Sequence, residues 1–515
     1  MRYSEQSLPV GIASGPVAAI DTDVLVVAAF EGDSAALGAA FDGAAAGRVA
    51  AALESREFTG KAGTIFVTPC ASPGWRPARL MLVGAGSRSG FDTAALRRAA
   101  AAAALASRDR RWRRVAFVLP AVLPLADEAQ AAAEGLTLAA HYSGIYKSDA
   151  DAKPVTIESL IAIPEQASAE ASTSAERSAA RGYILAACSN LARALANEPA
   201  NVITPRAFAE IAVQVAEEAG LKADVLDEDR LAGLNMGLLL GVARGSAERP
   251  RMVVLRYEPA RPATKAVLGL IGKGVTFDTG GISIKPSDRM HLMKTDMSGG
   301  AAVLAAMKAI AALKPEVAVV GVVPLVENMP GGRAMRPGDV VRSAEGKTVE
   351  VLDTDAEGRL ILADALWYAR QLGATHLVDV ATLTGAIGIA LGRTTTGLFG
   401  TPDSWVALVG RTANRAGDRA WALPLFEDYR EQLRSDIADL ANIGGRPAGS
   451  ITAALFLKEF TGGLPWAHLD IAWTAWAEES QPWQPKGPTG VAVRTLAELA
   501  CAFEEWPPAA QPPTA

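Results

Sequence analysis

Cysteine and histidine are scarce in this chain of 515 residues. The three cysteines, Cys70, Cys188 and Cys501, lie far apart and form no CxxC pair, so they can build neither a disulfide framework nor a thiolate zinc site. The four histidines show no HExxH or HxH spacing, which argues against a zinc site based on histidine. We therefore expect a reducing, cytoplasmic setting, and a metal site would have to use carboxylates.

The chain also lacks a long apolar run and a strong charge of one sign. The longest uncharged stretch, residues 6–20, falls short of the roughly 20 apolar residues that span a bilayer. No secretory signal is evident at the amino terminus. Fifty Lys and Arg against 56 Asp and Glu give a formal net charge of -6, which argues weakly against binding nucleic acid or an anionic membrane over the whole surface. We expect no membrane association.

Apolar residues, by contrast, make up 50% of the chain, which predicts a globular protein with large cores. Over the first 160 residues, short apolar runs typical of strands alternate with alanine-rich stretches of helical length. These runs are DVLVVAAF, GTIFVTP, LMLVGAG and VAFVLP. The alternation predicts a smaller N-terminal α/β domain over residues 1–165 with a largely parallel sheet.

The rest of the chain divides into a connection, a large domain and a tail. Residues 166–181, rich in Ala, Ser, Thr and Glu, are predicted to link the domains. Residues 182–506 show no comparable break, and strand-like runs again alternate with Ala/Leu-rich helices. They predict a larger C-terminal α/β domain with a mixed central sheet flanked by helices. Residues 507–515 carry two Pro-Pro pairs and are predicted to form a disordered tail.

Two segments of the larger domain place acidic residues among glycines or at a turn. In GKGVTFDTGGISIKPSDRMHLMKTDMSGGAAV, Lys273, Asp278, Lys285 and Asp296 are interleaved with six glycines. In VEVLDTDAEGRLILADAL, the turn between a strand-like and a helix-like run carries Asp353, Asp355, Glu357 and Arg359. Glycine lets the backbone approach a ligand, and α/β folds place their sites where strands lead into helices.

Four or five converging carboxylates would repel one another unless cations neutralised them. Taken singly, each acid fits a salt bridge with a nearby lysine or arginine, or a helix cap. Taken together, so many charges among glycines and apolar residues favour a carboxylate metal site.

The same residues resemble the leucyl (cytosol) aminopeptidases, a family of di-metal exopeptidases. DTDAEGRL, residues 353–360, resembles the family signature NTDAEGRL, and GKGVTFDTGGISIK resembles its GKG-TFDSGG-S-K segment. Further similar segments are NEPANVITP, MKTDM, ENMPGGRAMRPGD, DVATLTGA, ADLANIGGRPAGSITAALFLKEF and WAHLDIAWTAW. The resemblance covers roughly residues 182–500 and implies an aminopeptidase that hydrolyses peptides through a water activated by two metals.

Carried over position by position, the resemblance implies two divalent metal ions per subunit, Mn or Zn. One would be bound by Lys273, Asp278, Asp296 and Glu357, and the other by Asp278, Asp355 and Glu357. Lysine can be a ligand only as the neutral amine, which an adjacent dication can enforce. Lys285 would donate to the substrate carbonyl oxygen, and Arg359 would hold a bicarbonate ion that acts as general base.

The resemblance further implies a substrate pocket, a hexamer and a cytoplasmic location. The pocket for a leucine-like first side chain would involve Met293, Thr382, Leu383 and Gly385. Two departures from the pattern stand out: Asp353 replaces an asparagine, and Trp473 replaces a small residue in the HLDIAWTAW segment.

Two other functions stay open at this stage. The segment from Arg76 to Arg114 contains ten arginines and two aspartates, and could bind nucleic acid, although a solvated helix end explains it better. A dipeptidase dedicated to Cys-Gly would share all of the predicted metal ligands.

Overall fold

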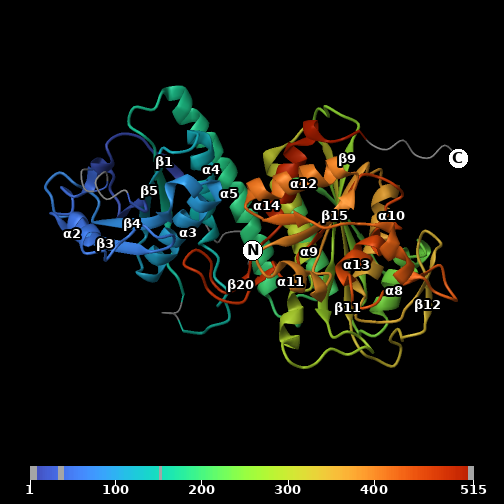
Figure 1. The fold of residues 1–515 in the computed structure, drawn as a ribbon. Coiled ribbons are helices and arrows are strands. Elements are labelled where there is room, and N and C mark those ends of the chain that lie inside the picture. Colours follow the sequence, from blue (N-terminus) through green and yellow to red (C-terminus); the bar gives the residue numbers. More distant parts are fainter. Residues whose placement is uncertain (1–7, 33–36, 38–39, 150–152, 509–515) are drawn as a thin grey trace. The chain divides into compact units, whose positions relative to one another are not determined.

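The computed structural model describes residues 8–32, 37, 40–149 and 153–508, which form two compact units (Figure 1). The first unit comprises Met1–Asn190 and Ala477–Gly487, and the second comprises Leu191–Trp476 and Pro488–Ala515. Residues 169–181, within the segment expected to link the domains, form the first part of helix α5 (Ala169–Asn197). This stretch is rich in alanine and contains no proline, so it can continue as one helix.

The first unit is built on one six-stranded sheet. Its strands lie in the order β1-β6-β5-β2-β4-β3, and neighbours are parallel except for the β3–β4 pair. The four apolar runs singled out in the sequence form β2, β3, β4 and β5, which confirms the expected α/β domain. Besides α5, the described elements of this unit are β1 (Gly11–Ala13), η1 (Val17–Ala19), β2 (Val24–Phe30), α2 (Arg48–Glu54), β3 (Ile65–Pro69), β4 (Arg79–Gly86), η2 (Arg88–Gly90), α3 (Thr93–Asp109), β5 (Arg114–Val118), α4 (Leu125–Leu138) and β6 (Glu158–Ala162).

Several arginines of the basic segment make contacts inside this unit. Arg97 pairs with the buried Glu134 at 2.5 Å. The Arg108 guanidinium donates to the carbonyl oxygens of Ala139 and His141, both at 2.9 Å. Arginines used in this way are less available to phosphates than the sequence alone suggests.

The second unit is built on a nine-stranded mixed sheet. Eight strands lie in the order β16-β15-β18-β14-β9-β11-β8-β7, and β10 also pairs with β11. The central strands β18, β14, β9 and β11 are parallel, whereas the pairs β15–β18, β11–β8 and β7–β8 are antiparallel. The strands of this sheet are β7 (Lys222–Leu226), β8 (Arg251–Tyr257), β9 (Val267–Gly272), β10 (Gly274–Asp278), β11 (Ala318–Asn328), β14 (His376–Ala381), β15 (Thr396–Thr401), β16 (Ala420–Ala422) and β18 (Trp466–Asp470).

Helices cover both faces of this sheet, as successive residues of β11 show. Val320 and Val322 belong to the apolar cluster that includes α10, whereas Gly321 lies against Met307 of α9. The expected mixed central sheet flanked by helices is therefore confirmed. The helices are α6 (Pro205–Ala219), α7 (Glu228–Gly233), α8 (Gly237–Ala243), η3 (Met290–Thr295), α9 (Ser298–Leu313), α10 (Gly358–Gln371), α11 (Gly385–Leu391), α12 (Asp403–Ala416), η4 (Glu427–Leu433), α13 (Gly449–Lys458), α14 (Val493–Cys501) and η5 (Phe503–Glu505).

Two small sheets complete the description. One has the order β12-β13-β17, from β12 (Val340–Arg342), β13 (Thr348–Glu350) and β17 (Leu440–Ala441), and the other pairs β19 (Trp476–Ala477) with β20 (Gly487–Pro488).

A buried carboxylate on α10 ties this helix to its neighbours. Asp364 is fully buried and accepts hydrogen bonds from the N–H groups of Leu239 at 3.0 Å and Ala344 at 2.8 Å. Burial raises the pKa of Asp364 to about 7, although these backbone donors act in the opposite direction. The contacts fix α10 against α8 and against the loop after β12.

One helical stretch of the described residues, Met290–Leu313, is long and apolar enough to cross a membrane by length and composition alone. Its most apolar stretch of 18 residues is 83% buried inside the structure, as expected of a core helix. His376 Nε2 hydrogen-bonds the carbonyl oxygen of Pro507 at 2.7 Å, so the start of the expected tail is attached. Residues 509–515 of that tail lie outside the described residues.

Candidate active site

The residues singled out in the larger domain gather at the carboxyl ends of its central parallel strands. Lys273 follows β9, Asp278 ends β10, and Thr382 follows β14. Strands β14 and β9 are in register, with Val380 opposite Gly272. Parallel strands end at the same edge of a sheet, so residues about a hundred positions apart meet there.

Two further elements complete the cluster. Asp296 follows η3 and lies two residues before the core helix α9. The Gly300 N–H of α9 donates to the Lys273 carbonyl oxygen at 2.7 Å. Asp355 and Glu357 belong to the turn that leads into α10. The strand, turn and helix expected around these two acids are thus present.

Two lysines face the four acidic side chains. Lys273 Nζ lies 2.8 Å from Asp296 Oδ2 and 2.8 Å from Glu357 Oε1. Lys285 Nζ lies 2.8 Å from Asp278 Oδ2 and also contacts Asp355. The Lys273 side chain is 4% exposed whereas that of Lys285 is 22% exposed, so solvent or substrate reaches only the second freely.

The carboxylates nevertheless outnumber the cations around them. Ligand oxygens of Asp278, Asp355 and Glu357 all lie within 4.8 Å of one another, the only such group of acids, histidines or cysteines among the described residues that is compact enough for a metal ion. Glu357 Oε2 is buried and has no hydrogen-bond partner there. The salt bridges of the alternative interpretation exist, but they leave this oxygen unsatisfied, and a cation fits the donor set.

The pKa values reflect this shortage of positive charge. Burial, together with the charges of Asp278 and Glu357, raises the pKa of Asp355 to about 7 despite the nearby Lys285. Burial and neighbouring carboxylates also raise the pKa values of Asp296 and Glu357. Burial alone would lower the pKa of Lys273, but the carboxylates of Asp296 and Glu357 outweigh it and raise that pKa.

Glycine is required at two positions of the cluster. A Cβ on Gly358, the first residue of α10, would lie 2.6 Å from Lys273 Cε and 2.7 Å from its Nζ. Gly280 has a φ of +86°, and a Cβ there would lie 2.8 Å from Asp355 Oδ1. Any other residue would displace the side chains that form the cluster.

Arg359 lies beside the cluster, in the first turn of α10. Its side chain is buried, its Nη1 donates to the Asn442 carbonyl oxygen at 2.9 Å, and its Nε has no partner in the described part of the chain. Burial lowers the pKa of Arg359 to about 10, although the charges of Glu357, Asp353 and Asp470 act in the opposite direction. A buried guanidinium with a free donor at a helix N-terminus fits a small anion.

The four residues expected at the substrate lie around this edge of the sheet. Thr382 Oγ1 donates to Asp296 Oδ1 at 2.7 Å, and its carbonyl oxygen accepts from Lys273 Nζ at 2.9 Å. Met293 belongs to η3, three residues before Asp296. Leu383 precedes the N-cap of α11, and its N–H donates to Asp470 Oδ1 at 3.3 Å.

Trp473, the unusual residue of the sequence pattern, packs on α11. Its Nε1 donates to the carbonyl oxygen of Gly385, the fourth expected substrate residue, at 3.0 Å. A Cβ on Gly388 would lie 2.2 Å from the Trp473 ring, and the Arg393 guanidinium stacks 4.9 Å from the ring centroid. The large ring therefore fits because α11 carries glycine opposite it.

The second departure, Asp353, has a local role. Its Oδ1 accepts a hydrogen bond from the Asp355 N–H at 2.9 Å, inside the turn that carries Asp355. Asparagine could make the same bond through its own Oδ1. The substitution therefore preserves the turn and adds a charge.

Sequence reasoning missed the buried polar residues that support the cluster. Asn328 Nδ2 donates to Asp278 Oδ1 at 2.8 Å and to the Thr354 carbonyl oxygen at 3.0 Å. Asp470 accepts from Thr384 Oγ1 at 2.6 Å. Asn442 lies in the ADLANIGGRPAGS segment, one of the family-like segments, yet nothing in that pattern says what it contacts.

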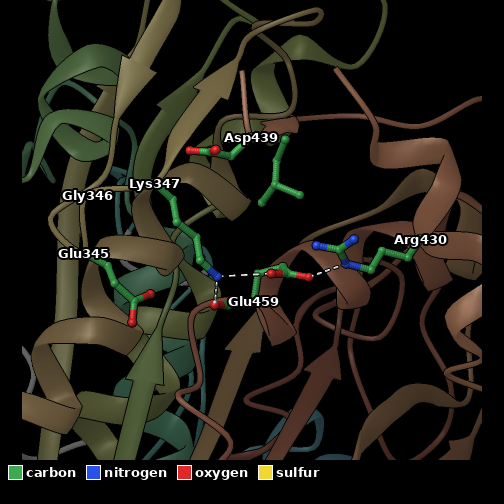
Figure 2. Close-up of a pocket in the computed structure, with 7 residues that line it drawn as sticks. Glu345, Gly346, Lys347, Arg430, Asp439 and Glu459 are labelled. Atoms are coloured by element: carbon green, nitrogen blue, oxygen red, sulfur yellow. Dashed lines mark hydrogen bonds and ion pairs between the residues drawn. The ribbon is translucent and has the colours of Figure 1, made fainter. Parts of the chain in front are cut away.

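An open hollow outside the cluster lies beside the small β12-β13-β17 sheet (Figure 2). Lys347 and Arg430 both reach Glu459 there, with Lys347 Nζ 3.0 Å from Oε2 and Arg430 Nε 2.5 Å from Oε1. Two cations already neutralise this carboxylate. The hollow contains none of the candidate site residues named from the sequence.

An α/β domain with lysines and carboxylates assembled at the carboxyl ends of its central strands is the architecture of a metal-dependent hydrolase. Comparison with known protein families agrees with this class. The cytosol aminopeptidase family matches twice, with its catalytic domain over residues 190–497 and its N-terminal domain over residues 26–150.

Individual relatives support the same assignment. A "Probable cytosol aminopeptidase" of Solibacter usitatus is 49% identical, covering 96% of this chain and 99% of its own length. Among solved structures, a mutant of tomato leucine aminopeptidase has a TM-score of 0.87 at 34% identity, covering 96% of this chain and 97% of its own. The bottromycin maturation enzyme BotP in complex with Mn has a TM-score of 0.82 at 39% identity, covering 94% of this chain and 99% of its own.

The chain therefore belongs to the cytosol aminopeptidase family and is a leucyl aminopeptidase-type metallo-exopeptidase, a hydrolase. The family and the activity expected from the sequence motifs are confirmed.

Proposed function

We propose that the chain releases leucine-like residues from the amino termini of peptides with two divalent metal ions. Lys273, Asp278, Asp296 and Glu357 would bind one ion, and Asp278, Asp355 and Glu357 the other. The observation that carries this proposal is the compact group of three carboxylates, with one buried Glu357 oxygen that has no partner among the described residues. Manganese is favoured because a similar enzyme is described in complex with Mn.

The two lysines take different roles in this proposal. When bound, the metals would polarise the scissile carbonyl and lower the pKa of a water molecule. Lys273 is almost fully buried against Asp296 and Glu357, so it suits a ligand, which requires loss of its proton. Lys285 is more exposed and would donate to the carbonyl oxygen as negative charge develops there.

We assign a bicarbonate ion to Arg359. The guanidinium is buried, its Nε lacks a partner in the described residues, and the backbone N–H groups at the start of α10 favour an anion. When bound there, bicarbonate would supply a general base next to the predicted metal ligands. A bicarbonate dependence of the rate that is lost in Arg359→Ala would support this role.

Met293, Thr382, Leu383 and Gly385 would surround the first substrate residue. Their mostly apolar character suits a leucine-like side chain. A dipeptidase dedicated to Cys-Gly would use the same metal ligands, so rates on Leu-Gly and Cys-Gly, measured side by side, decide between the two specificities.

The remaining proposals concern location and partners. The relatives are named cytosol aminopeptidases, which supports a cytoplasmic location. A homo-hexamer follows from the family resemblance, and light scattering of the purified protein tests it. Nucleic acid is a weaker alternative partner, and a salt-dependent gel shift that disappears when Arg110, Arg111, Arg113 and Arg114 are neutralised would support it.

The decisive experiment is hydrolysis of a chromogenic leucyl amide after chelation and again after addition of Mn²⁺. Activity should return in the unaltered protein and not in an Asp355→Ala/Glu357→Ala variant. Asp224→Ala is the matched control, because Asp224 is an exposed acid that pairs with Arg230 on the surface of the same unit. Folded protein that stays inactive with Mn, Zn and Co would overturn the proposal.

A further inference from the structure

Asn442 makes hydrogen bonds both to the turn that carries Asp355 and to Arg359 at the start of α10. The residue is fully buried and directly follows β17. Its sequence position is more than eighty residues away from the turn, so the contact depends entirely on the tertiary fold.

The side chain of Asn442 satisfies three backbone groups of the turn. Its Oδ1 accepts from the N–H groups of Leu352 at 2.8 Å and Asp353 at 3.3 Å. Its Nδ2 donates to the Asp353 carbonyl oxygen at 2.6 Å. Asp353 in turn holds the Asp355 N–H through Oδ1. The amide thus holds the backbone just before the first predicted ligand of this turn.

The main chain of Asn442 makes two more contacts. Its carbonyl oxygen accepts from Arg359 Nη1 at 2.9 Å, and its N–H donates to the Glu350 carbonyl oxygen at 2.9 Å. One residue therefore contacts the backbone before the acidic turn, the turn itself and the arginine beyond it.

The support behind Asn442 is itself fixed. Strand β17 pairs with β13, and Thr348 at the start of β13 donates to Asp439 Oδ2 through both its N–H and its Oγ1 at 2.8 Å. Asp439 lines the same open hollow as the Lys347–Glu459–Arg430 contacts (Figure 2). A buried amide on a held strand can fix the turn, whereas a mobile loop could not.

We propose that Asn442 is a positioning residue that holds the turn carrying Asp355 and Glu357 in a fixed position relative to Arg359. The inference rests on the proposed function, since it takes Asp355 and Glu357 as metal ligands and Arg359 as the anion site. The amide is specifically required, because aspartate would place a second acceptor against the Asp353 carbonyl oxygen.

The test compares Asn442→Asp and Asn442→Ala with the unaltered full-length protein. Mn²⁺ affinity, measured by calorimetric titration, should fall by about 10- to 100-fold, as is typical when a group that orients a metal ligand is removed. The kcat for a leucyl amide should fall with little change in KM. Amide hydrogen exchange should accelerate in peptides covering residues 352–357.

Asn414→Ala is the matched control. Asn414 lies in the same unit and its side chain accepts one backbone hydrogen bond, from the Ala420 N–H at 3.3 Å, away from the cluster. It should change the melting temperature at most, and leave Mn²⁺ affinity and exchange in residues 352–357 unaltered.

The outcomes separate the two proposals. If both Asn442 variants keep the exchange of residues 352–357 and the Mn²⁺ affinity of the unaltered protein, the positioning role is wrong, even if they are less stable. If the unaltered protein fails to bind Mn²⁺ or to hydrolyse the amide, the proposed function fails, while the exchange measurement still decides whether Asn442 holds the turn.

Discussion

Replacing Gly358 by alanine tests whether the geometry around Lys273 governs metal binding. The added Cβ would lie 2.6 Å from Lys273 Cε, whereas carbon atoms in contact prefer about 3.5–4.0 Å. The lysine, or the start of α10, must therefore shift by about 1 Å. Overpacking of this kind costs about 1–3 kcal/mol, so the domain should still fold.

Function should suffer more than stability. Lys273 Nζ lies 2.8 Å from both Asp296 and Glu357, and a shift of about 1 Å removes it from ligand geometry. We expect the folded variant to bind one metal instead of two, measured by elemental analysis after dialysis, and to lose about 100-fold in kcat.

Gly233→Ala is the matched control, because nothing lies within 4 Å of a Cβ at this glycine of α7. It should keep metal content and activity and have equal or higher stability. A Gly358→Ala protein that binds two metals with unaltered kcat would contradict this prediction, because it would show that Lys273 can shift without loss of metal binding or activity.

Three further predictions follow from single side chains. Lys285→Met should bind two Mn²⁺ ions as before, by elemental analysis, yet lose about 100-fold in kcat, and unaltered kcat would contradict its role at the carbonyl oxygen. Asp353→Asn should retain activity, whereas Asp353→Ala should lower Mn²⁺ affinity, because only the first keeps an acceptor for the Asp355 N–H; equal titration curves for the two would count against this. Burial raises the pKa of Asp364 in the folded state to about 7. Between about pH 4 and about pH 7, the folded state therefore keeps this proton while the unfolded state loses it. The contribution of Asp364 to stability consequently falls as pH rises over that range. The melting temperature of the unaltered protein relative to Asp364→Asn should therefore decline over that range, and a constant or rising difference would show that the sign is wrong.

Much of the fold could be predicted because local pattern and tertiary role agree in it. The runs DVLVVAAF and LMLVGAG are β-rich segments of strand length, and they form neighbouring strands β2 and β4. The acidic turn between VEVL and LILADAL also follows from local pattern, since a strand-like run gives way to helical spacing there. Helix α5 was harder to place, because an alanine-rich segment with serine and threonine suits a linker and a helix alike.

The candidate site residues could be named from the sequence, because the lysines, the acids and Arg359 lie in two contiguous segments of the chain. How those segments meet depends on the folded structure. Three features depend on distances between strands and helices. They are which carboxylate oxygen lacks a hydrogen-bond partner, the close approach of Gly358 to Lys273, and the hydrogen bond of Asn442 to a turn some ninety positions earlier. Local sequence patterns encode which element forms, whereas hydrogen bonds between distant segments are set only when the elements pack.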